Sequence, residues 1–198
     1  MTENDRLPRQ IEFLVEIDKL KQVYRQTWLM DQSRLENDAE HSWHLAVLAV
    51  VLAEYAAGPD LDLVKVLKMV LIHDLVEIDA GDTYAYDTDS QRDQAQRERK
   101  AADRLFHILP PDQAAEFRAY WDEFDARETP EACYAAALDR LQPLLHNYHT
   151  QGKAWREHGI TSDRVFERNS PAADGAPVLW QYAEGLIRDA VEKGYLAK

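Results

Sequence analysis

The chain has 198 residues, of which 45% are hydrophobic, so it can bury one substantial core and is expected to fold as a single domain over residues 1–198. It carries 36 acidic residues against 23 Lys and Arg, and its formal net charge of -13 argues against nucleic acid polymers as partners. The single cysteine, Cys133, excludes an intrachain disulfide framework and a cysteine-rich zinc motif. Any metal ion must therefore be held by histidine and carboxylate groups.

The chain shows no sign of a membrane segment. Its first ten residues, MTENDRLPRQ, are polar and lack the hydrophobic stretch of a signal peptide. The longest apolar run, residues 45–53, is much shorter than a membrane span. We therefore expect no membrane partner and a cytoplasmic location.

Helical periodicity dominates the chain, and no stretch alternates apolar and polar residues for long enough to suggest a sheet. The sequence therefore predicts an all-α fold. The expected helices span residues 9–23, 40–57, 61–79, 89–108, 111–126, 130–150 and 175–193.

Two of these helices are apolar on nearly every side: HLAVLAVVLAEYAA, which starts at His44, and LVKVLKMVLIH, which ends at His73. A helix without a polar face belongs inside a bundle, so both are predicted to be buried. His41 stands where the first of them begins, beside Asp38 and Glu40, and is a candidate metal ligand. His44 is interpreted as an ordinary core or surface histidine.

The segment LIHDLVEIDAGD, residues 71–82, starts as an apolar run and continues with His73, Asp74 and Glu77. On an α-helix, Glu77 lies about 40° and Asp74 about 100° from His73, so the three side chains can converge. An ionised carboxylate beside apolar neighbours is costly unless a positive charge compensates it. A divalent cation would do so, because imidazole and carboxylate are suitable ligands. The alternative is a helix end that surfaces, with solvated acids.

The expected helix at residues 130–150 carries Asp139 beside an apolar stripe and among alanines, which makes it a further candidate ligand. Pro143 follows four residues later and has no N–H to donate to the carbonyl group of Asp139. A kink is therefore expected at this turn. The alternative is a helix that ends near Gln142.

A histidine, an adjacent His-Asp pair about thirty residues later and an isolated aspartate on a later helix resemble the pattern of the HD-domain metal-dependent phosphohydrolases. Within this superfamily the chain is most similar to the 5′-deoxynucleotidase group. The motifs LKQVYRQTW, RLENDAEHSWHLAVLA, HDLVEIDAGD and AALDRL carry the resemblance over residues 15–150. It implies an HD-domain helical bundle with a metal site among buried helices, followed by a helical extension over residues 151–198.

The resemblance also implies one divalent metal ion. Only His107 lies between the His-Asp pair and the last aspartate, whereas two-metal members of the superfamily have more histidines in this interval. Histidine and carboxylate ligands accept Mn, Co, Mg, Zn, Fe and Ni, so the sequence does not select among them. The implied metal ligands are His41, His73, Asp74 and Asp139.

The same resemblance implies roles in the reaction. A metal ion lowers the pKa of bound water and neutralises phosphoryl oxygens, while a nearby carboxylate takes the proton. A guanidinium group can bind a phosphate monoester with two hydrogen bonds. The implied residues are Glu77 and Asp82 for proton transfer, Arg25 for the phosphate, and Trp28 for substrate binding.

The sequence departs from the nucleotidase pattern in two places. TYAYDTDSQ follows the GD pair in place of a proline-containing loop, and Trp28 lies two residues further from Arg25 than that group has it. Both places lie where sugar and base would be recognised, so the reaction class is better defined than the substrate. In the tail, Trp155, His158 and Arg164 are interpreted as helix packing and loop, not as part of the site.

The sequence thus predicts a phosphomonoesterase that hydrolyses nucleoside 5′-monophosphates, deoxy forms above all. One alternative is a nucleoside triphosphohydrolase, which is disfavoured because the cations near the motifs are only Arg25, Arg34 and Lys68. The other is a non-catalytic metal- or nucleotide-binding regulatory module, which would be expected to lose Glu77 or Asp82 first. The expected partners are a small-molecule phosphate ester and, because apolar surface remains and the family is commonly oligomeric, a second copy in a homodimer.

Overall fold

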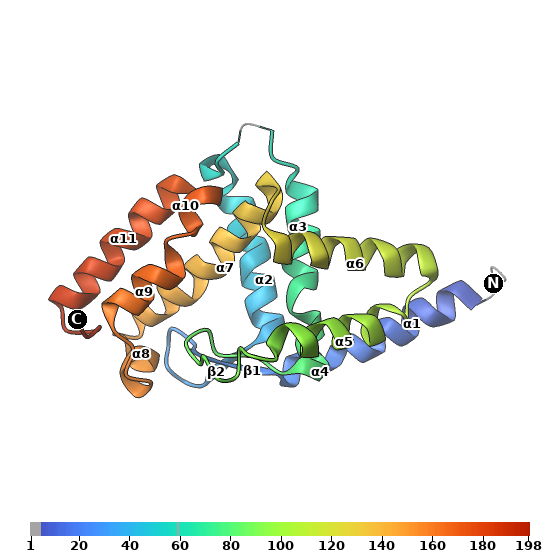
Figure 1. Ribbon diagram of the computed structural model, residues 1–198, viewed down its shortest axis with the longest axis horizontal. Helices are drawn as coiled ribbons and strands as arrows, with labels where there is room; N and C mark the ends of the chain where they lie inside the picture. Colours follow the sequence, from blue (N-terminus) through green and yellow to red (C-terminus); the bar gives the residue numbers. More distant parts are fainter. Residues whose placement is uncertain (1–4, 59) are drawn as a thin grey trace.

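The computed structural model describes residues 5–58 and 60–198. The protein is predominantly helical, which confirms the predicted all-α class, and it has one short antiparallel strand pair in addition (Figure 1). In chain order the elements, with η for a 3-10 helix, are α1 (Arg6–Glu16), η2 (Ile17–Gln22), β1 (Tyr24–Trp28), β2 (Leu35–Asn37), α2 (Asp38–Val51), η3 (Ala53–Tyr55), α3 (Leu63–Ile72), η4 (His73–Val76), α4 (Glu77–Ala80), α5 (Gln94–Phe106), α6 (Pro111–Ala126), α7 (Pro130–His149), α8 (Lys153–Glu157), α9 (Ser162–Asn169), α10 (Ala172–Gly175) and α11 (Pro177–Glu192).

The elements that the sequence did not predict are all short. The strands β1 and β2 have five and three residues, and α8, α9 and α10 have at most eight. Segments of this length contain too few residues for periodicity to identify them. In the strand pair, Tyr24 lies opposite Asn37 and Trp28 opposite Leu35.

The helix predicted at residues 61–79 is interrupted at the His-Asp pair, which corrects the predicted geometry. The α-helix ends at Ile72, and residues 73–76 form a 3-10 turn before α4 begins. In a 3-10 helix residues three apart lie above one another, so Asp74 is aligned with Glu77. The angles expected for an unbroken α-helix therefore do not apply to these three side chains.

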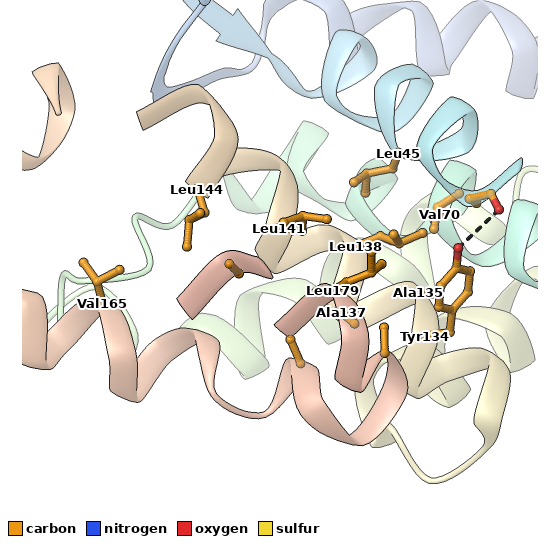
Figure 2. Packing of buried hydrophobic residues seen from close by; sticks show 14 of the residues in the cluster. Leu45, Val70, Tyr134, Ala135, Ala137, Leu138, Leu141, Leu144, Val165 and Leu179 are labelled. Carbon is orange, nitrogen blue, oxygen red and sulfur yellow. Dashed lines mark hydrogen bonds between the residues drawn. The ribbon is translucent and has the colours of Figure 1, made fainter. Parts of the chain in front are cut away.

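The helix α7 runs through the middle of the molecule (Figure 1). It continues past Pro143 to His149, so the alternative in which it ends near Gln142 is wrong. One core cluster surrounds it and includes Leu45, Val70 and Leu138 together with residues of α9 and α11 (Figure 2). The C-terminal segment therefore shares the core of the motif-bearing helices.

A second core cluster is formed by α1, α5 and α6 and includes Phe13, Leu105 and Trp121. Leu75 in η4 belongs to this second cluster, whereas Val70 in α3 belongs to the first. The chain thus passes from one core to the other at the His-Asp pair. This passage places both side chains at the junction of the two clusters.

The prediction that the two apolar helices are buried is wrong for part of each, because α2 has one exposed apolar face and α3 leaves Val64 and Leu71 64% and 49% exposed. Within residues 5–58 and 60–198, no helix is both long enough and apolar enough to span a bilayer. On α2 the exposed apolar side chains lie on one face, at the spacing i, i+4, i+7 and i+8, and α1 has a similar exposed stripe of Leu7, Ile11, Leu14 and Val15. This apolar face of α2 comprises Trp43, Val47, Val50 and Val51, which are 65%, 42%, 55% and 64% exposed.

Candidate metal centre

The four predicted metal ligands converge from three elements. His41 comes from α2, His73 and Asp74 from η4, and Asp139 from α7. The Nε2 atom of His41 lies 3.1 Å from Oδ1 of Asp139 and 3.8 Å from Oδ2 of Asp74. The Nε2 atom of His73 lies 3.1 Å from Oδ1 of Asp74 and 3.9 Å from Oδ1 of Asp139. Two imidazoles and two carboxylates therefore face one point.

The protonation of His73 indicates that this point suits a cation. Its Nδ1 atom lies 3.0 Å from the carbonyl oxygen of Val70, which can only accept, so Nδ1 carries the hydrogen. Its Nε2 atom then presents a lone pair toward the carboxylates of Asp74 and Asp139. This atom is buried and has no hydrogen-bond partner in the described part of the chain. Facing lone pairs repel unless a positive charge lies between them.

The same reasoning holds for His41, through Gln142. The Nε2 atom of Gln142 lies 2.6 Å from Oε1 of Glu36, which only accepts, so the amide oxygen of Gln142 must point the other way. That oxygen lies 3.1 Å from Nδ1 of His41 and accepts its hydrogen. Burial lowers the pKa of His41, which favours the neutral imidazole. Its Nε2 lone pair is therefore free to bind a metal ion.

A second group of possible metal ligands, Glu36, His44 and His146, lies next to this centre. The amide nitrogen of Gln142 already contacts all three, at 3.0 Å from Nε2 of His146 and 3.3 Å from Nδ1 of His44. This neutral amide group fills the position that a cation would need. These three side chains therefore hold the Gln142 amide that orients His41. His44 does not belong to the predicted ligand set.

Three further carboxyl groups border the centre: Asp38 and Glu77 are buried, and Asp82 is half-buried. Burial raises the pKa of Asp38 to about 7 and that of Asp82 to about 6, and nearby carboxylates such as Asp74 add to both shifts. Burial also raises the pKa of Glu77 well above its usual range, which favours a protonated Glu77 that can donate a hydrogen bond to Asp38. Two neighbouring acids that share a proton are suited to proton transfer. Asp38 was missed as a site residue, although it begins the buried helix just before His41.

Arg25 and Trp28 lie on the same strand but in different surroundings. The Nη1 atom of Arg25 lies 3.0 Å from Oδ2 of Asp74 and 3.3 Å from Oδ1 of Asp38, and Arg25 lines the cavity at the centre. Trp28 is not among the residues that line this cavity. Its indole N–H donates to Glu157 at 2.8 Å, and the ammonium group of Lys153 lies 3.1 Å from the ring centroid. An odd spacing along a strand places side chains on opposite faces.

The cavity beside the centre has a volume of about 190 Å³, roughly ten times what one water molecule needs. The loop after Asp82 lines it with Tyr84 and Tyr86, and α8 contributes Trp155. The ring of His158 lies 4.5 Å from that of Tyr84. Arg164 donates to the carbonyl oxygen of Tyr86. Trp155 packs in the core, as the sequence indicates, and in addition forms part of the cavity wall.

Comparison with known proteins gives relatives that share this architecture. A crystal structure at 1.37 Å resolution of a predicted metal-dependent phosphohydrolase from Magnetospirillum magnetotacticum MS-1 superposes with a TM-score of 0.94. It is 54% identical and covers 98% of this chain and 96% of its own. Human 5′-deoxynucleotidase HDDC2 is 26% identical over 136 residues, which are 68% of this chain and 65% of that protein.

The Dictyostelium discoideum 5′-deoxynucleotidase HDDC2 is 27% identical over 143 residues, 70% of this chain and 75% of that protein. The chain thus spans just under two thirds of the human relative and three quarters of the slime-mould one. The model of the HD domain family matches residues 17–180. The resemblance seen in the motifs is therefore confirmed: the chain belongs to the HD domain family, within the superfamily of HD-domain metal-dependent phosphohydrolases.

Proposed function

We propose that the protein is a metal-dependent phosphohydrolase that releases phosphate from nucleoside 5′-monophosphates, deoxy forms above all. The observation that carries this proposal is the convergence of the His41 and His73 lone pairs with Asp74 and Asp139 at the wall of a cavity. The names of the relatives support the same reaction. The amide nitrogen of Gln142 contacts Glu36, His44 and His146, which argues against a second metal ion in that neighbouring group.

In this proposal His41, His73, Asp74 and Asp139 would hold one divalent ion, which would neutralise phosphoryl oxygens and make bound water more acidic. The positive charge would also lower the pKa of Glu77, since an opposite charge favours the ionised carboxylate. Glu77 can then accept a proton from the attacking water.

Two other residues complete the proposed reaction. Asp82 lines the cavity, and burial raises its pKa to about 6 in the protein without a metal ion. It is therefore suited to protonate the leaving oxygen atom. Arg25 lines the same cavity and would bind the substrate phosphate. The Trp28 side chain contacts Glu157 and Lys153 of α8 and does not line the cavity. We therefore propose no direct contact between Trp28 and the substrate.

The cavity wall supports an aromatic substrate. Tyr84 and Tyr86 both line the cavity, and their ring centroids are 5.4 Å apart. Aromatic side chains provide flat apolar surfaces on which a nucleobase can stack. This loop replaces the proline-containing one of the nucleotidase group, so it is where base preference would be set.

The test is phosphate release from a panel of nucleoside mono- and triphosphates with Mn²⁺, Co²⁺, Mg²⁺ or Zn²⁺, or with EDTA. Metal-dependent release from monophosphates that is lost in Glu77→Gln supports the proposal. The matched control is Glu54→Gln, because Glu54 is exposed and outside the site. A protein that binds metal but releases no phosphate from any panel member would be the regulatory module instead.

We also propose that the protein forms a homodimer. The apolar face of α2 leaves Trp43, Val47, Val50 and Val51 in contact with solvent in the isolated chain. A continuous apolar stripe of this kind is typical of a face that contacts another protein. Light scattering should give twice the mass of the 22.9 kDa chain, and Val47→Glu should yield monomers. A wild-type protein of monomer mass would contradict this.

A further inference from the structure

Three arginines line the cavity of the candidate metal centre although they are distant in the sequence. They are Arg127 after α6, Arg140 in α7 and Arg168 in α9. In the described part of this strongly acidic chain, none of the three forms an ion pair with a carboxylate. The cavity therefore has a basic part beside its acidic metal centre.

Arg140 is the buried member of this cluster and is only 6% exposed. Its Nε atom donates to the carbonyl oxygen of Arg168 at 3.0 Å, and its Nη1 atom donates to that of Ala136 at 3.1 Å. Both acceptors are uncharged, and Asp139 and Asp174 act on the Arg140 charge without forming an ion pair with it. The like charges of Arg168 and Arg127 act on Arg140, and burial of its own charge is unfavourable. A bound anion would remove this unfavourable energy.

The backbone of Arg127 supports a role for its side chain. It is the residue at the end of α6, with φ 55° and ψ 38°, in the left-handed region. Glycine is preferred at this position because it has no Cβ atom to be strained. An arginine here gives up backbone stability while its side chain reaches the cavity. Residues held in such conformations are concentrated at ligand-binding sites.

The cluster lies beside the metal centre. Arg140 directly follows the ligand Asp139, and the charge of Arg168 acts on the Asp139 carboxylate. Phe124, one turn before Arg127, lies with its ring 4.6 Å from that of His73. An anion on the arginines and a phosphate at the metal centre could therefore belong to one small molecule.

We propose that Arg127, Arg140 and Arg168 form a second anion site and that the substrate is a phosphate ester with a second phosphate group. This inference rests on the proposed function, which assigns the reacting phosphate to the metal centre. Nucleoside 5′-diphosphates and nucleoside 3′,5′-bisphosphates both have this chemistry.

The proposal revises the sequence argument against substrates with several phosphates. That argument counted the cations near the motifs. Arg34 pairs with Glu40 and Lys68 with Glu116, and neither lines the cavity. The cavity is instead lined by Arg25 together with Arg127, Arg140 and Arg168, which come from α6, α7 and α9 or their ends.

The experiment measures equilibrium binding in a Glu77→Gln background with Mn²⁺, so that turnover does not interfere. The ligands are a nucleoside 5′-monophosphate, the 5′-diphosphate and the 3′,5′-bisphosphate of the same nucleoside. We expect one two-phosphate ligand to bind about tenfold more tightly than the monophosphate. Arg127→Gly and Arg168→Gln should each remove most of this advantage and leave monophosphate binding unchanged. The control is Arg99→Gln, on the exposed surface of α5.

Three outcomes would overturn the proposal. The first is that neither two-phosphate ligand binds more tightly than the monophosphate. The second is that the gain in affinity survives both arginine substitutions. The third is that the substitutions weaken monophosphate binding as much as they weaken binding of the two-phosphate ligand. The last result would mean that the arginines hold the reacting phosphate itself. Failure of the proposed function would give a different result. The wild type would then release no phosphate, while the tighter binding of the two-phosphate ligand and its loss in the arginine variants would still support the anion site.

Discussion

The amide oxygen of Gln142 accepts a hydrogen bond from Nδ1 of His41 at 3.1 Å, and both side chains are fully buried. Gln142 lies one turn after Asp139 on α7, so one helix supplies a proposed ligand and fixes the tautomer of another. Gln142→Leu should therefore weaken metal binding by about ten- to hundredfold, as loss of such supporting hydrogen bonds does elsewhere. Competition with a chelating dye measures this affinity.

The control for this prediction is Gln96→Leu, because Gln96 is exposed on α5. Recovery of part of the affinity in Gln142→Glu, whose carboxylate also accepts from His41, would attribute the loss to the hydrogen bond. Unchanged affinity in a folded Gln142→Leu protein would contradict the assigned role.

Asp74 should be the most damaging single site to neutralise. Its oxygens lie near His73, His41 and Arg25, at 3.1, 3.8 and 3.0 Å. Asp74→Asn removes a ligand charge from the proposed metal site, so metal content by mass spectrometry should fall to background and kcat/KM by at least about a hundredfold. The matched control is Asp79→Asn, which alters only a surface ion pair with Arg104. Full metal content in Asp74→Asn would remove this residue from the ligand set.

The stability of the metal-free protein should fall as the pH rises. Burial raises the pKa of Glu36 and Asp38 to about 7 and that of Asp82 to about 6. The folded state therefore binds more protons than the unfolded state between pH 4 and 7, and ionisation on raising the pH destabilises it. Each unit of pKa shift corresponds to about 1.4 kcal/mol before screening. The Tm in EDTA should thus be lower at pH 7.5 than at pH 5.

Saturating Mn²⁺ should reduce this fall, because a divalent cation favours the ionised carboxylates. Thermal unfolding at both pH values, with EDTA or Mn²⁺, gives the four Tm values required. If the Tm in EDTA were equal at the two pH values or higher at pH 7.5, the carboxyl groups would not be held protonated in the folded protein.

Arg127→Gly should stabilise the fold while it weakens binding of the two-phosphate ligand. The left-handed backbone of Arg127 costs roughly 1–2 kcal/mol for a residue with a Cβ atom, and the greater freedom of glycine in the unfolded chain offsets part of this gain. The expected net gain in the free energy of unfolding is about 1 kcal/mol, measured by urea denaturation. A loss of stability would indicate that the Arg127 side chain supports the fold.

The convergence of the four proposed metal ligands could be predicted from the sequence because these residues occur at recognisable places. His41, His73 and Asp74 stand at the ends of apolar helices, where a charged group is conspicuous, and Asp139 stands among alanines. The long helices could be predicted for the same reason, since their periodicity extends over several turns.

The supporting residues could not be predicted, since their roles arise only from tertiary contacts. Gln142 looks like any polar residue in a helix until α2 places His41 against it. Arg140 and Arg168 are distant from the motifs in sequence and meet only because α9 folds back onto α7. The 3-10 turn at His73 was equally hidden, because the sequence pattern through it fits an unbroken α-helix.

The passage of the chain between two core clusters at the His-Asp pair has a thermodynamic consequence. His41 and Asp139 lie on helices of one cluster, whereas His73 and Asp74 lead into the other. A cation bound by all four would act as a cross-link between two hydrophobic units that otherwise could open separately. Occupancy of the centre would then decide whether the molecule unfolds as one cooperative unit or as two, and slow hydrogen exchange would extend across α5 only in the loaded protein.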